Sequence, residues 1–327
     1  NIIDKFGDDR RTEITNISIG KKEKEIETVV AEDCVVVLTR LGNIKRIPKS
    51  SFKVQKRNGK GVKTADDTIL SLVSTNTIDN LLIFTSLGKM YRLLVDNVPV
   101  GTNVSRGVHI NTLIPSLGNG ESVIAAASLD RDNKYKNVVF ITKQGMIKKT
   151  ELSEYKSIKR NAGTVAIKIK DGDSIANVEF MNDEDLVLIS KDGMGIHFET
   201  KDIAPIGRNT AGVKSIKLSE GDFVIAGIPI RENDSSIGVF SENGYGKKLT
   251  IEDIPIQGRN GKGVSIYKNI NGTGKVSAAT GLAANDTVMI FGVGNTICIE
   301  SKDIPPLSRV SQGNLMIKGQ IKTVVRL

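Results

Sequence analysis

The stretch Val35-Val36-Val37-Leu38-Thr39-Arg40-Leu41-Gly42-Asn43-Ile44-Lys45-Arg46 carries the signal that decides the fold. It consists of an apolar, β-branched run, a short polar turn that reaches a glycine, and a second run with basic residues. A glycine in this position supplies the positive φ that a tight hairpin needs. The stretch therefore predicts a β-hairpin.

The same pattern recurs six times along the chain. Its turn positions are Gly42, Gly88, Gly145, Gly193, Gly244 and Asn295, separated by 46, 57, 48, 51 and 51 residues. In the sixth copy Asn stands for Gly because it is the next most tolerant residue for a left-handed turn. A second glycine follows each turn after 18 or 19 residues, at Gly61, Gly107, Gly163, Gly212, Gly263 and Gly313. Two glycines in register over six copies predict a repeat architecture.

Each repeat has room for about four short strands in roughly 50 residues, which is the size of a propeller blade. Six blades of that size take about 300 of the 327 residues. The sequence therefore predicts an all-β fold, a six-bladed propeller-like disc of four-stranded antiparallel blades over residues 31–327. Residues 1–30 are charged and are expected to form a connector from an upstream domain that can add a closing strand.

The composition excludes several classes of protein. Lys and Arg number 46 against 37 Asp and Glu, a net charge of +9 that favours a polyanionic partner. Two cysteines, Cys34 and Cys298, are too few for a disulfide framework and indicate an intracellular protein. Two histidines do not supply a zinc cluster. No apolar run reaches the roughly 18 residues that a membrane-spanning helix needs.

The chain contains no convincing catalytic motif. Gly272-Thr273-Gly274-Lys275 shares part of the pattern of a phosphate-binding P-loop, but the earlier glycine is missing and Val276 follows the lysine. Acidic pairs such as Asp66-Asp67 lie in polar turns. We therefore expect no catalytic residue, no metal site and no cofactor.

The seven residues that end at each second glycine form a recurrent basic loop. Their third position is Arg57, Asn103, Lys159, Arg208, Arg259 or Arg309, so five of the six are cationic. Glycine beside a cation lets backbone N–H groups and a charged side chain approach one phosphate together. Because the repeat places this cation equivalently on every blade, we expect a ring of positive charge.

One of these loops resembles the hallmark of a known family. Gln55-Lys56-Arg57-Asn58-Gly59-Lys60-Gly61 is similar to the Gln-Arg-Arg-Gly-Gly-Lys-Gly box of the C-terminal domains of DNA gyrase A subunits, which belong to bacterial type IIA topoisomerases. Lys56 keeps the charge of the Arg it replaces, and Asn58 keeps the tolerance of positive φ. The lead-in at residues 6–14 resembles the family's junction with the cleavage core. The resemblance covers essentially the whole chain.

The resemblance implies a β-pinwheel, whose blades exchange a hairpin and whose basic outer rim bends duplex DNA with positive writhe. In the gyrase holoenzyme, such bending leads to negative supercoils. This chain alone would not be catalytic, because the family's cleavage tyrosine lies in the core and its ATPase in the B subunit. The implied partners are duplex DNA, contacted at phosphates with little sequence preference, the A-subunit cleavage core, and the B subunit in an A2B2 assembly. A membrane is not among them, and the implied location is the bacterial cytoplasm, at the nucleoid.

The candidate DNA-binding residues are the box and the cations of the hairpins and loops. They are Lys45, Arg46, Gln55, Lys56, Arg57, Asn58, Gly59, Lys60, Gly61, Arg92, Arg106, Lys148, Lys149, Lys159, Arg160, Arg208, Lys214, Lys247, Lys248, Arg259, Lys262 and Arg309.

Two alternatives stay open. The equivalent domain of topoisomerase IV resembles this family in fold but lacks or degrades the box, and it would present DNA without strong wrapping. A propeller-like scaffold would instead bind proteins, and it would need aromatic anchors on a face of the disc. The near-intact box at 55–61 argues against the first alternative, and aromatic residues at 4% of the chain make the second less favoured.

Overall fold

The computed structural model describes Lys5 and residues 29–51, 69–102, 104–118, 120–129, 135–156, 158, 163–270 and 272–326. Apart from Lys5 and residues 29 and 30, the predicted connector at 1–30 lies outside the described residues. The box at 55–61 and the predicted site residues Lys159 and Arg160 also lie outside them.

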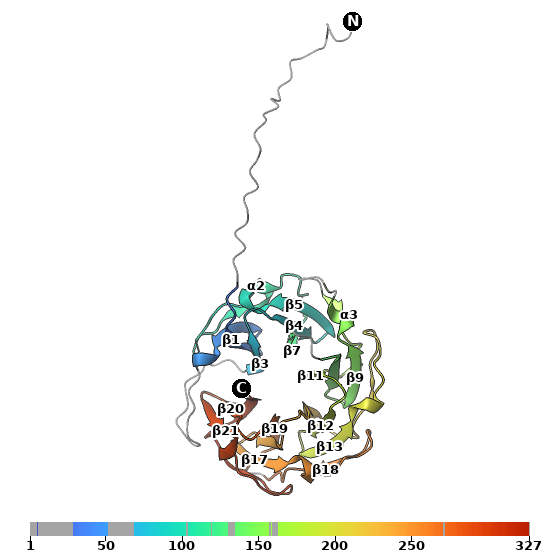
Figure 1. Ribbon diagram of the computed structural model, residues 1–327, viewed down its shortest axis with the longest axis vertical. Coiled ribbons are helices and arrows are strands. Elements are labelled where there is room, and N and C mark those ends of the chain that lie inside the picture. Colours follow the sequence, from blue (N-terminus) through green and yellow to red (C-terminus); the bar gives the residue numbers. More distant parts are fainter. Residues whose placement is uncertain are drawn as a thin grey trace.

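Six small antiparallel sheets surround a central axis, which confirms the predicted all-β, six-bladed fold (Figure 1). In order within each sheet, the first three sheets contain β3 (Ile69–Asn76), β1 (Asp33–Thr39), β2 (Asn43–Pro48) and β6 (Val108–His109); β7 (Val123–Leu129), β4 (Asn80–Thr85), β5 (Lys89–Leu94) and β10 (Thr164–Val165); and β11 (Ile175–Met181), β8 (Asn137–Thr142), β9 (Met146–Glu151) and β14 (Val213–Lys214).

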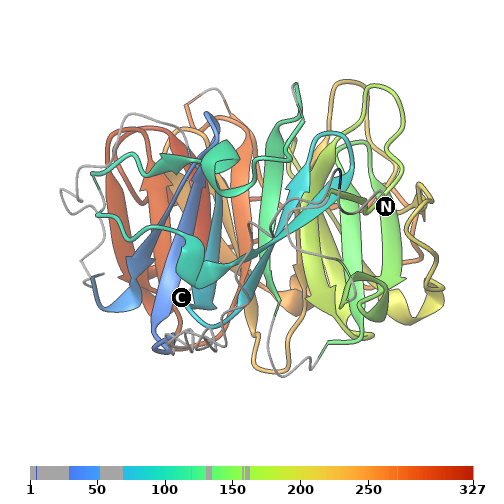
Figure 2. The same cartoon turned by 90° about the horizontal axis from the view of Figure 1, so that it is seen from above.

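The other three sheets contain β15 (Val224–Pro229), β12 (Asp185–Ser190), β13 (Met194–Glu199) and β18 (Val264–Ser265); β19 (Val276–Leu282), β16 (Ser236–Ser241), β17 (Tyr245–Thr250) and β22 (Asn314–Leu315); and β23 (Ile321–Arg326), β20 (Thr287–Gly292) and β21 (Thr296–Glu300). Within the described residues, five sheets thus have the four predicted strands and the sixth has three. Seen from its edge, the disc has strands that run roughly along its axis (Figure 2).

Short helical turns connect the strands. They are η1 (Lys49–Ser51), η2 (Val95–Asn97), α2 (Ile110–Leu113), α3 (Ser153–Lys156), η3 (Thr200–Asp202), η4 (Ile251–Asp253) and η5 (Ser301–Asp303). In the described part of the chain, no helix has the length and apolar character needed to cross a membrane.

The hairpin turns follow the predicted glycine pattern in five of the six blades. Gly42, Gly88, Gly145, Gly193 and Gly244 all have positive φ, between 69° and 90°. The prediction for the sixth turn was wrong, because the positive φ of 77° belongs to Gly294 and not to Asn295. This turn has one residue fewer between its paired strand ends, Phe291 and Thr296, than the turn between Phe84 and Met90. The shorter turn moves the left-handed position back by one residue.

The last strand of each complete sheet comes from the following repeat. It begins directly after the second glycine, and it pairs with the outer strand of the preceding hairpin, as Val108 does with Ile44 and Asn314 with Gly246. The glycine is needed because the chain turns at positive φ against the preceding blade. A Cβ on Gly212 would lie 2.2 Å from the carbonyl oxygen of Ile147, and Gly107 and Gly263 are similarly crowded. Gly163 is an exception, since its φ is not positive.

Apolar side chains fill the space between neighbouring blades. The rings of Phe84 and Phe140 meet edge to face with centroids 5.3 Å apart, and they join the second blade to the third. Ile69 and Leu72 on β3 pack against Val35 and Val37 of their own blade, and also against the cluster of the sixth blade that contains Met289. The ring is therefore closed by packing between the first and last repeats.

The six innermost strands, β3, β7, β11, β15, β19 and β23, line the axis (Figure 1). They enclose a cavity of about 460 Å³ whose wall is rich in small residues such as Ala126, Ala176 and Gly227. Acidic groups at the axis are paired with arginines. Arg231 binds Glu184 at 2.8 Å, and Arg326 binds Asp286 at 2.7 Å and also Asp234. The Arg326–Asp234 pair joins the sixth blade to the neighbouring fifth blade, whereas each of the other two pairs lies within one blade.

The exchanged strand leads to a stability prediction. We expect Gly212→Ala to lower the free energy of unfolding by about 2 kcal/mol or more, because it adds a Cβ at a positive φ of 84° against a carbonyl oxygen. Gly207→Ala in the same loop is the matched control, because its Cβ would have nothing within 4 Å. Urea unfolding measures both, and equal stability of the two variants would contradict this account of the second glycine.

Candidate nucleic-acid interface

Four loops lie along the rim of the disc, at residues 99–107, 205–212, 255–263 and 305–313; we call them the rim loops. Each runs beside the outer hairpin strand of the preceding blade. The amide of Arg46 donates to the carbonyl of Pro99 at 2.9 Å, and Lys248 and Pro305 repeat this bond at 2.9 Å. Main-chain hydrogen bonds to the preceding blade thus hold each rim loop in place, independently of the side chains of the loop.

The rim loops present several of the predicted cations to solvent. Arg106, Arg259 and Lys262 are exposed, as is Lys214 on β14, while Arg208 and Arg309 are half-buried. Arg208 lies 3.6 Å from Glu154, and the guanidinium of Arg259 donates to the carbonyl of Lys214 at 3.1 Å. Exposed cations of this kind can bind phosphate oxygens without losing many internal contacts.

The fifth repeat shows how a box-like sequence folds. In Gln257-Gly258-Arg259-Asn260-Gly261-Lys262-Gly263, Asn260 has a φ of 66°, the one positive value for a non-glycine residue in the described chain. Its amide donates to the carbonyl of Ser215 at 2.7 Å. Asn58 stands at the equivalent position of the box. Asn260 shows that an asparagine in this position tolerates the left-handed backbone.

Four predicted DNA contacts are corrected by the structure. Lys45, Lys148, Lys149 and Lys247 are at most 5% exposed. Lys247 donates to the carbonyls of Ser308, Arg309 and Ser311 at 2.7–2.8 Å, and Lys149 donates to the carbonyl of Thr200 at 2.9 Å. These lysines are buried because chain from another part of the fold, a rim loop in the case of Lys247, covers the outer strand. Their ammonium groups are buried and bind acceptors inside the protein, so they are not presented at the surface.

Three further predicted residues are half-buried at the outer strands. Arg46 forms an ion pair with Asp96 at 2.9 Å, and Lys248 donates to the carbonyl of Ser301 at 2.8 Å. Arg92 is half-buried on β5. Much of the charge on these strands is therefore engaged with the protein itself.

Sequence reasoning missed a second series of cations. Five residues after the second glycine stand Lys168, Lys217, Lys268 and Lys318, and all four are exposed. Three of their amides donate to the following rim loop at one repeated position: Lys168 to Thr210 at 3.1 Å, Lys217 to Gly261 at 2.8 Å and Lys268 to Ser311 at 3.1 Å. The constant offset from the second glycine was the signal that could have found them.

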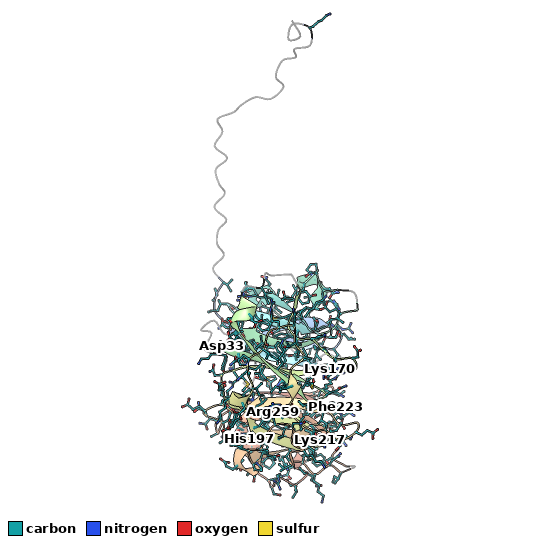
Figure 3. All side chains as sticks on the ribbon, turned by 90° about the vertical axis from the view of Figure 1, so that its right-hand side faces the viewer. Asp33, Lys170, His197, Lys217, Phe223 and Arg259 are labelled. Carbon is teal, nitrogen blue, oxygen red and sulfur yellow. The ribbon has the colours of Figure 1, made fainter. Side chains whose placement is uncertain are left out.

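Each of these contacts brings two cations to one blade junction. Lys217 of the fourth repeat and Arg259 of the fifth lie near each other on the rim (Figure 3). Arg208 and Arg309 belong to the rim loops that Lys168 and Lys268 contact. The rim thus carries positive charges from two repeats at each of three successive blade junctions.

The described residues contain no group of three or more His, Cys, Asp or Glu side chains arranged to hold a metal ion. His197 is buried, with Nδ1 2.9 Å from the carbonyl of Ile254 and Nε2 3.3 Å from Asp185. Burial raises the pKa of Cys34 to about 11.

Comparisons with known proteins agree with the fold and the repeat. The family model described as the DNA gyrase C-terminal domain, a beta-propeller, matches residues 35–76, 79–130, 136–180, 184–231 and 239–280. The chain belongs to this family. The DNA gyrase A subunit of Escherichia coli (strain K12) is 34% identical over 319 residues, and that of Staphylococcus aureus (strain COL) is 33% identical over 328 residues.

These alignments cover 96% and 97% of this chain but only 36% of each of the two gyrase proteins. Among solved structures, the gyrase A C-terminal domain superposes with a TM-score of 0.81 at 25% identity, covering 90% of this chain and all of that domain. The C-terminal domain of DNA topoisomerase IV superposes with a TM-score of 0.69 at 26% identity, covering 92% of this chain and 94% of that domain.

The buried lysines predict a pH dependence of stability. Burial lowers the pKa of Lys247 from 10.5 to about 8, against a smaller opposing effect of Asp253. Between pH 8 and 10.5 the unfolded chain therefore holds a proton that the folded chain has lost, so the contribution of Lys247 to stability rises with pH. We expect the stability of the wild-type chain, relative to Lys247→Met, to increase from pH 7 to pH 9.5 in urea unfolding. A relative stability that falls over this range would contradict the prediction.

Proposed function

We propose that this chain binds duplex DNA around its rim, mainly through phosphates. The observation that carries the proposal is the repeated pair of cations at successive blade junctions, an exposed lysine beside a cation-bearing rim loop. Duplex DNA offers a regular row of phosphates, and contacts to them carry no direct sequence information. The binding is therefore expected to show little sequence preference.

The geometry of the ring favours bending of the bound duplex. Charges that recur around a disc can contact DNA only if it curves, and bending costs several kcal/mol for a polymer with a persistence length of about 150 bp. Many small phosphate contacts, each with release of counterions, can offset that cost. We infer that the duplex follows the rim, and the resemblance to the gyrase family favours positive writhe for its path.

Membership of the gyrase family supports a proposal about the larger enzyme in which this chain binds DNA. In our proposal the chain acts within the A protein of DNA gyrase, next to the cleavage core, in an A2B2 holoenzyme with the B protein that introduces negative supercoils in the bacterial cytoplasm. The chain itself contributes DNA geometry, while cleavage and ATP hydrolysis belong to the parts of the enzyme outside it.

Two alternatives are less well supported. The topoisomerase IV domain superposes less closely than the gyrase domain, and the box at residues 55–61 is nearly intact in sequence. A protein-binding scaffold would present aromatic anchors. Among the described residues, the exposed large hydrophobic side chains are all aliphatic, for example Leu41, Val100 and Ile256.

The salt dependence of binding tests the proposal. With about six to eight phosphates neutralised, the logarithm of the association constant for a mixed-sequence duplex should fall against log salt with a slope of about −5 to −7. A slope near −1 would contradict binding along the rim.

One matched pair of variants locates the contacts. Lys217→Ala should reduce the magnitude of the slope by about 1, because it removes one exposed phosphate contact. Lys322→Ala is the control, since Lys322 is also an exposed lysine but lies on β23 at the axis. If both variants change the slope equally, the DNA does not follow the rim.

A further inference from the structure

Three lysines occupy one register position in three different blades. Lys45, Lys148 and Lys247 pair across their hairpins with Val37, Phe140 and Val239. They belong to the first, third and fifth blades. In the second, fourth and sixth blades the same position holds Tyr91, Ile196 and Ile297, opposite Ile83, Leu188 and Ile290. The lysines therefore alternate around the ring.

Each lysine binds the same part of the following rim loop. Lys247 donates to Ser308, Arg309 and Ser311, which stand five, four and two residues before the second glycine. Lys45 donates to the carbonyls of Thr102 and Ser105, the equivalents of Ser308 and Ser311, at 2.7 and 2.6 Å. Lys148 donates to the carbonyl of Arg208, the equivalent of Arg309, at 2.5 Å.

The loops above these lysines share a further feature. Two residues before the second glycine they carry a hydroxyl, at Ser105, Thr210 or Ser311, which donates back to the carbonyl three residues earlier at 2.7–3.1 Å. The described loop above an isoleucine differs, since Gly261 stands there. A Cβ on Gly261 would lie 3.4 Å from the Cδ1 of Ile196. The residue at the buried register position and the residue two positions before the second glycine thus vary together between the blades of this chain.

We propose that Lys45, Lys148 and Lys247 are positioning residues that hold three alternate rim loops in the shape in which their cations face DNA. An ammonium group has three donors and no acceptor, so it can bind several convergent carbonyls at once. Burial of the ammonium group makes these bonds costly to lose, because an unpaired buried charge is strongly unfavourable. Since one acceptor is the carbonyl of Arg208 or Arg309 itself, the lysine fixes the backbone that carries that cation.

We call each of these lysines, together with the rim-loop carbonyls that it binds, a clamp. Hydrogen exchange tests whether the clamp holds the loop in the absence of DNA. The amides of Leu307 and Ser311 bond to Lys248 and Ser308 beside the clamp. In Lys247→Met we expect these two amides to exchange at least about tenfold faster than in the wild type, the factor of one lost charge-assisted hydrogen bond. The exchange rates of the β16 amides should change only by the amount that the change in global stability explains. Ile196→Met is the matched control at the same register, and it should leave the 305–313 loop unchanged.

Lys247→Met buries a different side chain and could fail to fold. Ser311→Ala is therefore a second variant. It removes the loop hydroxyl that accepts from Lys247 at 3.2 Å and donates to the carbonyl of Ser308 at 2.9 Å, and it leaves the lysine in place. Because the three carbonyl bonds of Lys247 remain, we expect Ser311→Ala to accelerate exchange in this loop by a smaller factor than Lys247→Met does. Loop exchange in Lys247→Met that is no faster than in Ser311→Ala, or that changes only with global stability, overturns the clamp.

The role in DNA binding rests on the proposed function and needs a second readout. We expect Lys247→Met and Arg309→Ala each to weaken binding of a mixed-sequence duplex and to reduce the salt slope by about 1. The double variant should bind no worse than Arg309→Ala alone, because both changes act on one contact. Additive losses, or unchanged affinity in Lys247→Met despite faster loop exchange, would overturn the positioning role. A wild-type chain that does not bind the duplex would overturn the proposed function together with that role, while hydrogen exchange alone decides whether the clamp exists.

Discussion

The short strand that each of the second to sixth repeats gives to the preceding blade is the constraint on which the rest of the described structure depends. Its two residues pair with the outer hairpin strand, as Gly246 does with Asn314, and a glycine at positive φ lets the chain approach that closely. The pairing links consecutive blades through the main chain. It also fixes where each rim loop lies, because the loop ends at that glycine.

The placement of charge follows from this exchange. A rim loop that lies over the outer strand turns a surface position into a buried one, so Lys45, Lys148 and Lys247 become internal donors. The same exchange carries the residues after the short strand beside the next loop, where Lys217 reaches Gly261. Cations with similar sequence surroundings therefore end up in opposite roles, some holding the loops and others facing solvent.

Much of the architecture could be predicted from the sequence, because it depends on local signals that repeat. The glycine period predicted the number of blades, and the apolar runs predicted the hairpins. A left-handed turn at Asn295 follows only if all six turns have equal length, and the sixth turn is one residue shorter. The burial of Lys148 and Lys247 cannot be predicted from strand alternation alone, because a loop some 60 residues away in the sequence covers them. Lys168, Lys217, Lys268 and Lys318 were missed although their constant offset was present in the sequence.

The central claim is that the basic rim bends duplex DNA with a definite handedness. The most direct measurement is to ligate nicked circular DNA in the presence of saturating amounts of the chain, remove the protein and determine the distribution of linking number. The account predicts a shift to higher linking number than in a protein-free control, growing with the number of chains bound. An unchanged distribution under conditions where the DNA is fully bound would contradict it.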